Sequence, residues 1–135
     1  MNKPPNMIKT SKEIGQIGED AATRFLRRRL YRILCRNYID GKYEIDIIAE
    51  CRRAIVFLEV KARTGDRAVY ERYGLPSDAV DAKKRAFIIS AARTYLARHK
   101  IEKPPRFDVI EIYFSPDKSG NILKIRHMKD AYRAY

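Results

Sequence analysis

Two apolar runs of this 135-residue chain carry charged residues at positions where a buried strand should be hydrophobic. Asp46 lies in the run 43–50, and Glu59 and Lys61 lie in the run 54–61. Burying an ionised carboxylate without a partner costs several kcal/mol or forces the group to take up a proton. These residues therefore predict either a bound cation or an ion-pair cluster.

The two runs are expected to form an antiparallel hairpin, whose register decides whether the two carboxylates meet. Side chains alternate between the faces of a strand, and directly paired residues point the same way. A four-residue loop at 51–54 brings the carboxylates to one face, whereas a three-residue loop separates them. A two-residue Arg52-Arg53 turn would require positive φ at residues that resist it. The predicted pairs are therefore Glu50 with Ile55, Asp46 with Glu59 and Glu44 with Lys61.

The charge on this shared face favours a metal ion. Two carboxylates about 4 Å apart repel by about 4 kcal/mol at an effective dielectric near 20, and one lysine offsets about one such interaction. Asp46, Glu59 and Lys61 leave a charge of −1, and Glu19 would make it −2. Because all the ligands are oxygens, Mg²⁺ or Mn²⁺ is the expected cation. The alternative is a structural ion-pair cluster of Lys61 with Glu44 and Glu59.

The composition predicts a polyanionic partner. The chain has 29 Lys and Arg against 17 Asp and Glu, a formal charge of +12. Nucleic acid is favoured over an anionic membrane, because no long amphipathic helix or lipidation motif accompanies the charge. No apolar run approaches the roughly 18 residues needed to span a bilayer. The two cysteines and two histidines are too far apart to predict a structural zinc site. Without an apolar leader at the amino terminus, we expect a cytoplasmic protein.

Hydrophobic periodicity predicts a single α/β domain over 11–135, preceded by a flexible tail at 1–10. Thr10 and Glu13 form the pattern of a capping box, followed by helical spacing to about residue 30. A long polar stretch at 62–76 predicts a surface loop. The expected strands are 31–38, 43–50, 54–61, 106–114 and 122–127, with a second helix capped by Ser77 or Asp78 and a tail at 129–135. This order, αβββαββ, predicts a central mixed β-sheet flanked by helices.

An ordered set of motifs resembles a known family. The motifs are Gly15-x-x-Gly18-Glu19-x-x-Ala22, Glu44-Ile45-Asp46-Ile47-Ile48-Ala49, Phe57-Leu58-Glu59-Val60-Lys61 and Arg106-Phe107-Asp108-Val109. Together they resemble the YraN-like family of small bacterial proteins over residues 11–132. That family resembles the restriction-endonuclease-like nucleases and is similar to archaeal Holliday junction resolvases. One departure is Tyr43, where the family usually has Gly before Glu-Ile-Asp.

The resemblance implies a restriction-endonuclease-like fold and a metal-dependent nuclease site. Asp46 and Glu59 would bind the metal together with the Val60 carbonyl. Lys61 would orient or help to deprotonate the attacking water, and Glu19 would complete the acidic cluster. Such a site suits phosphodiester hydrolysis, which needs a polarised phosphoryl oxygen, a basic nucleophile and charge relief on the leaving oxygen.

Basic residues around this site would contact phosphates in a salt-sensitive way with little base readout. The candidates for nucleic-acid binding are Arg27, Arg28, Arg63, Arg67, Arg72, Lys83 and Lys84. DNA is favoured over RNA, and a homodimer would match the two-fold symmetry of a four-way junction. We expect Asp108 to be an ion-pair partner of a lysine in the second helix. The competing hypothesis is a non-catalytic nucleic-acid-binding module that keeps the fold and uses the acidic cluster for stability.

Overall fold

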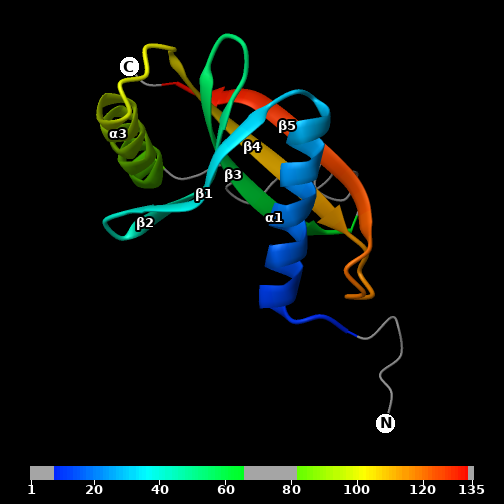
Figure 1. The fold of residues 1–135 in the computed structure, drawn as a ribbon. Coiled ribbons are helices and arrows are strands. Elements are labelled where there is room, and N and C mark those ends of the chain that lie inside the picture. The colour runs from blue at the N-terminus through cyan, green and yellow to red at the C-terminus, as the bar shows by residue number, and fades with distance from the viewer. Residues whose placement is uncertain (1–7, 66–81, 134–135) are drawn as a thin grey trace.

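One five-stranded mixed sheet forms the centre of the fold in the computed structural model, which describes residues 8–65 and 82–133. Its order is β1-β2-β3-β4-β5, with β3 and β4 parallel and the other neighbours antiparallel (Figure 1). The elements are α1 (Ser11–Arg28), β1 (Arg32–Asp40), β2 (Tyr43–Glu50), β3 (Ile55–Thr64), α3 (Ala82–Arg98), β4 (Pro105–Phe114) and β5 (Ile122–Tyr132). The predicted αβββαββ order is confirmed and is consistent with a restriction-endonuclease-like fold.

The first helix begins at the predicted capping box. The side chain of Thr10 accepts a hydrogen bond from the Glu13 N–H, and the Glu13 carboxylate accepts one from the Thr10 N–H, both at 3.1 Å. This pair satisfies two backbone donors that the first turn leaves without helical partners. Neither α1 nor α3 is long and apolar enough to cross a membrane.

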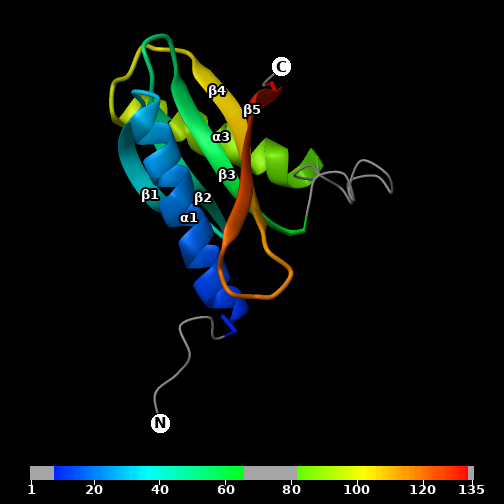
Figure 2. The same ribbon diagram turned by 90° about the vertical axis from the view of Figure 1, so that its right-hand side faces the viewer.

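The two helices cover opposite faces of the sheet, as Figure 2 shows. Leu26 of α1 lies in one apolar cluster with Val56 and Leu58 of β3. Ala92 of α3 lies in a second cluster with Phe57 of β3. The alternation of side chains along β3 therefore supplies both cores, and whatever follows Phe57 with the same parity faces α3.

The hairpin between β2 and β3 has the predicted register. Glu50 pairs with Ile55, so residues 51–54 form the four-residue loop. The ladder ends where Ile47 pairs with Leu58, although both strands continue beyond that point. The early end of the ladder leaves the second half of β3 paired with β4 alone among the described strands.

A bend in the β1/β2 hairpin explains why its ladder with β3 stops. Asn37 has a positive φ of 54° and lies opposite Asp46, between the pairs that flank it in the β1/β2 register. Ile45 consequently belongs to the cluster under α3, whereas Ile47 belongs to the cluster under α1. The outer half of the hairpin thus swings away from β3 toward α3 (Figure 1).

Three expectations about this sheet are wrong. The pairings of Asp46 with Glu59 and of Glu44 with Lys61 do not form, because the ladder between β2 and β3 ends at Ile47 and Leu58. β3 continues to Thr64, into the stretch expected to be a loop. The cause is its pairing with the parallel strand β4, which the polar sequence of this stretch did not indicate. The expected tail after residue 128 is part of β5. The predicted helix caps Ser77 and Asp78 lie outside the described residues.

Candidate functional site

Asp46 occupies the place where the β2/β3 ladder would have continued. In the observed register the next hydrogen-bonded pair would join Val60 to Ile45. Instead, the Val60 N–H donates to Asp46 Oδ2 at 2.8 Å. Because the N–H and C=O of one strand residue point to the same edge, the Val60 carbonyl also faces this side of β3. The bend therefore places a carboxylate and a backbone carbonyl beside each other.

The environment of Asp46 opposes its negative charge. Burial raises the pKa of its carboxyl group to about 6, although the hydrogen bond from Val60 acts in the opposite direction. The neighbouring carboxylates of Glu59, Glu19 and Glu44 raise the pKa further. Three acidic side chains therefore act on the charge of Asp46, although Glu19 comes from α1 and Glu59 contacts α3.

Glu59 is bonded on one oxygen and not on the other. Its Oε1 lies 2.9 Å from the Lys61 Nζ and 2.6 Å from the Lys84 Nζ of α3. Its side chain is 11% exposed, and Oε2 is buried with no hydrogen-bond partner. A buried oxygen without a donor costs free energy, and such an atom calls for a ligand or a role.

Glu19 reaches the cluster from α1 and carries its own counter-ion. Its Oε1 lies 2.9 Å from Nε of Arg36 in β1, and Nη2 of the same arginine lies 2.7 Å from Asp20 Oδ1. Lys84 and Arg36 were both left out of the charge count made from the sequence. The excess of negative charge expected from Asp46, Glu59 and Lys61 is therefore largely neutralised by side chains.

Within residues 8–65 and 82–133, no group of three or more His, Cys, Asp or Glu side chains is arranged to hold a metal ion. The set implied by the resemblance contains two carboxylates, Asp46 and Glu59, and the Val60 carbonyl. Mg²⁺ commonly binds through one or two carboxylates and keeps several waters. The metal site thus stays a prediction, with a donor set that suits this ion.

Tyr43, the departure from the family pattern, joins β2 to α3. Its ring stacks on that of Phe87 with centroids 4.4 Å apart and an interplanar angle of 26°. The Lys42 Nζ lies 5.6 Å from the Tyr43 ring centroid. Phe87 lies about one turn after Lys84, so this stack connects the strand that bears Asp46 to the helix that bears Lys84.

We expect Tyr43→Ala to lower the free energy of unfolding by about 1 kcal/mol, the usual value of an aromatic pair plus some lost burial. Phe87→Ala should have a similar effect, and the double variant should cost less than the sum of the two. Urea denaturation of all four proteins measures this coupling. Strictly additive effects would show that the stack itself contributes nothing.

Tyr132 is a neighbour of the site that the sequence did not reveal, because it lies in the expected tail. Burial raises the pKa of its phenol well above the usual value, and the charge of Glu59 adds to the effect. The Arg85 guanidinium carbon lies 5.1 Å from its ring centroid. The end of β5 therefore borders the Glu59 side of the cluster.

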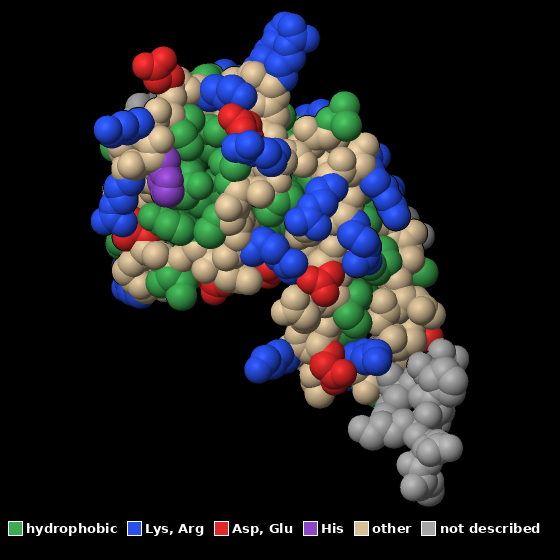
Figure 3. All heavy atoms as spheres, viewed as in Figure 1, with side chains coloured by type: hydrophobic (Ala, Val, Ile, Leu, Met, Phe, Trp, Pro, Cys, Tyr) green, Lys and Arg blue, Asp and Glu red, His purple; other side chains and the backbone are tan. Residues whose placement is uncertain are grey.

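The basic candidates divide into exposed and buried groups. Arg27 and Arg28 end α1, Lys83 begins α3, and all three are exposed. In the view of Figure 3, Lys and Arg side chains are spread over the face on which α1 lies and are not confined to one stripe. This distribution suits general attraction of a polyanion better than a single narrow groove.

Arg63 differs from the other candidates, because its side chain is only 13% exposed. Its Nε lies 3.3 Å from Oε2 of Glu111, a fully buried carboxylate that also bonds Arg126 at 3.1 Å. Arg63 is better explained as a counter-ion of Glu111 than as a nucleic-acid contact. Arg67 and Arg72 lie outside the described residues.

Asp108 is an ion-pair partner, as expected, but not of a lysine in the second helix. Arg106 holds both of its oxygens, with Nε at 2.9 Å and Nη2 at 2.7 Å. His127 Nε2 lies 2.7 Å away, and the Asp130 N–H donates at 2.9 Å. The residue lies on the α1 side of β4, where α3 cannot reach it, so the expected lysine was wrong.

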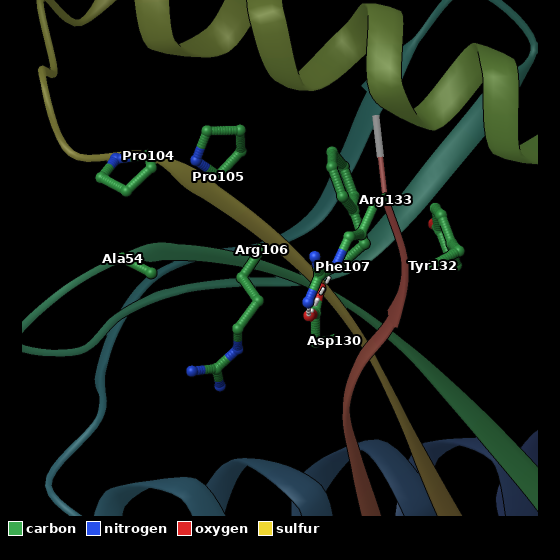
Figure 4. A pocket seen from close by; sticks show the side chains of 8 residues that line it. All are labelled: Ala54, Pro104, Pro105, Arg106, Phe107, Asp130, Tyr132 and Arg133. Carbon is green, nitrogen blue, oxygen red and sulfur yellow. Dashed lines mark hydrogen bonds and ion pairs between the residues drawn. The ribbon is translucent and has the colours of Figure 1, made fainter. Parts of the chain in front are cut away.

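A pocket of about 430 Å³ lies at the start of β4 (Figure 4). Its lining residues are Ala54, Pro104, Pro105, Arg106, Phe107, Asp130, Tyr132 and Arg133. In the close-up, Asp130 and Arg133 are joined by their ion pair. None of the residues predicted for the site lines this pocket, but Tyr132, which borders the Glu59 side of the cluster, does. The pocket is therefore a neighbour of the candidate site.

Comparison with known proteins places the chain among relatives of similar length. Residues 18–112 match the family described as "Uncharacterised protein family UPF0102". A UPF0102 protein of Symbiobacterium thermophilum is 42% identical over 125 residues, covering 92% of this chain and 99% of the relative. One from Caldanaerobacter subterraneus subsp. tengcongensis is 38% identical over 122 residues, covering 90% and 95%. Another, from Porphyromonas gingivalis, is 39% identical over 119 residues, covering 87% and 82%.

Proposed function

The chain belongs to the UPF0102 (YraN) family, and from its site we propose that it is a metal-dependent nuclease that hydrolyses phosphodiester bonds in branched DNA. The observation that carries this proposal is the pair formed by Asp46 and Glu59. Burial of Asp46 opposes the ionised form of its carboxyl group. Glu59 buries an oxygen atom, Oε2, that accepts no hydrogen bond from the described residues. A divalent cation between them would relieve both costs at once.

The donor set fits Mg²⁺ or Mn²⁺. Asp46 and Glu59 supply carboxylate oxygens, the Val60 carbonyl faces the same edge of β3, and water would fill the other positions. When bound, the metal would polarise a phosphoryl oxygen and lower the pKa of a water molecule. Lys61, which contacts Glu59 at 2.9 Å, would orient such a water or, once it is neutral, accept its proton. Glu19 holds Arg36 at the rim of the cluster.

Branched DNA is proposed as the substrate because the basic residues are dispersed. Arg27, Arg28 and Lys83 are exposed on two different helices. Side chains distributed in this way can contact phosphates of more than one duplex arm but present no element shaped for reading bases in a groove. Recognition would then depend on the arrangement of the arms and would weaken with salt.

A second candidate function is a nucleic-acid-binding module without catalysis. The observation in its favour is that Lys61 and Lys84 already neutralise Glu59, and Arg36 neutralises Glu19. A cluster balanced in this way can serve stability alone. Both candidates predict salt-sensitive DNA binding, so only cleavage and metal binding distinguish them.

The test is cleavage of flap, fork and four-way junction DNA by purified protein with Mn²⁺, with Mg²⁺ and with a chelator. We expect Asp46→Asn and Glu59→Gln to lower the Mn²⁺-dependent rate at least about 100-fold while DNA binding persists. Glu50→Gln is the matched control, since Glu50 is also a β2 carboxylate paired with Arg32 and Lys103 at the surface. Metal-independent cleavage, or none on any substrate with Mn²⁺ unbound, would favour the second candidate.

A further inference from the structure

Two ammonium groups share one oxygen of Glu59. Lys61 reaches Oε1 from two residues along the same strand, and Lys84 reaches it from α3 at 2.6 Å, the shorter of the two contacts. The other oxygen, Oε2, has no partner among the described residues. The Glu59 carboxylate therefore has two cationic partners at Oε1 and, among the described residues, none at Oε2.

A divalent cation between Asp46 and Glu59 would not leave this arrangement unchanged. It would stand within a few ångströms of both ammonium groups, and like charges at such distances repel strongly in a half-buried site. One of the lysines must then move away. The two differ in how firmly their backbones are held and in where their side chains can go.

Lys84 is the more displaceable of the two. Lys61 is held in the middle of β3 by its parallel pairing with Glu111 of β4. The two side chains are almost equally exposed, 28% for Lys61 and 31% for Lys84, but Lys84 lies where the described part of α3 begins and reaches Glu59 from another element. A rotation of its four-carbon stem takes the ammonium from the cluster to the solvent without moving the backbone.

Lys84 stands among other positive charges. Lys83 and Arg85 flank it in the chain, where the described part of α3 begins. Glu59 Oε1 is an anionic partner 2.6 Å from its Nζ. If Glu59 turned to a metal, a phosphate of the nucleic acid would be a replacement anion for this basic segment.

We propose that Lys84 is a displaceable counter-ion of the site, which pairs with Glu59 in the absence of metal and moves to a nucleic-acid phosphate when a divalent cation binds. This inference rests on the proposed function, because it needs the metal site to exist. It makes the binding of metal and of nucleic acid mutually favourable, since each frees the partner that the other requires.

The inference predicts that one substitution strengthens the binding of metal and weakens the metal-dependent binding of nucleic acid. Lys84→Met keeps most of the stem but removes the charge, so Mn²⁺ no longer competes with an ammonium group. We expect the Kd for Mn²⁺ without nucleic acid to fall about 10-fold. The same variant should bind a four-way junction more weakly in Ca²⁺ but with unchanged affinity in a chelator, where Lys84 is occupied by Glu59.

Lys83→Met is the matched control. It removes the same charge from the adjacent, exposed position of the same turn. It should leave the Kd for Mn²⁺ within about 2-fold, and any loss of junction affinity should be equal with Ca²⁺ and with a chelator. Mn²⁺ binding is followed by the electron paramagnetic resonance signal of the free ion, and circular dichroism confirms that both variants are folded.

The outcomes separate the two proposals. If Glu59→Gln abolishes Mn²⁺ binding while Lys84→Met leaves it unchanged or weaker, the metal site stands and the role of Lys84 is refuted. If the wild-type protein and all variants bind Mn²⁺ equally weakly, there is no specific site, and the proposed function fails together with this inference. Tighter binding in Lys84→Met, with the junction affinity affected only in Ca²⁺, supports both.

Discussion

Asp108→Ala is expected to lower the free energy of unfolding by about 3 to 5 kcal/mol, the usual cost of breaking a buried ion pair from one side. The side chain of Asp108 is fully buried and accepts from Arg106, His127 and the Asp130 N–H. Removing it leaves the Arg106 guanidinium, which is 22% exposed, without a carboxylate and with the neutral Tyr31 hydroxyl and Cys51 Sγ as its hydrogen-bond partners among the described residues. β4 and β5 would also lose the contact that joins them beside residue 130.

The matched control for this prediction is Arg133→Ala. Arg133 also forms an ion pair at 2.7 Å, with Asp130, but the two side chains are 70% and 38% exposed. Exposed pairs contribute about 0 to 1 kcal/mol. Urea denaturation at pH 7 should therefore separate the two variants by several kcal/mol. Similar losses in both would mean that the burial of Asp108 does not decide its contribution.

The same group makes stability depend on pH. Burial alone would raise the pKa of Asp108, but hydrogen bonds from His127 and Arg106 more than offset it, so the pKa is lowered in the folded protein. The folded state therefore holds its proton less tightly than the unfolded state does. The contribution of Asp108 is complete above the unfolded pKa, near 3.8, and is lost as the pH falls through the lower folded value.

Asp46→Asn is expected to do the reverse and raise the free energy of unfolding at pH 7 by about 1 to 3 kcal/mol. Burial first, and the carboxylates of Glu59, Glu19 and Glu44 after it, raise the pKa of Asp46 from 3.8 to about 6. Ionisation of Asp46 therefore destabilises the folded protein relative to the unfolded chain. Asparagine removes the charge but retains an oxygen that can accept from the Val60 N–H.

The pH dependence gives this prediction its sharpest test. At about pH 3 and below, Asp46 is mostly protonated in both states, so the variant and the wild type should be almost equally stable. As the pH rises through 3.8 to about 6, the folded wild type must release a proton that it holds more tightly than the unfolded chain does, and the difference should grow. Chelator-treated protein unfolded by urea from about pH 3 to 8 measures it. A destabilised variant, or a difference independent of pH, would contradict the raised pKa.

Local signals in the sequence predicted the parts of the fold that depend on neighbouring residues. The capping box of Thr10 and Glu13 identified the start of α1, and the parity of Asp46 and Glu59 identified the register of the hairpin. Each of these depends on a few residues close in the chain, where periodicity and turn chemistry decide the outcome.

The unpredicted parts depend on residues far apart in the sequence. Asn37 bends β1 through a positive φ, which polar residues adopt only in some contexts. No neighbouring residue in the sequence predicts this bend. Lys84 reaches Glu59 because the crossover brings α3 onto that face of the sheet. Arg106 forms an ion pair with Asp108 from two residues away on the same strand, whereas a lysine of the second helix was the expected partner. The metal, the nucleic acid and the oligomeric state remain predictions.

The parallel pairing of β3 with β4 also has a consequence for how the chain folds. Ile55 pairs with Pro105, and every later pair joins residues about fifty positions apart. Such non-local contacts close a large loop before they return any free energy, so they form late and slowly. The hairpin of β2 and β3 can assemble first, which brings Asp46 and Glu59 together before α3 has docked. We therefore expect the two carboxylates to meet during folding before Lys84 is in place as their counter-ion.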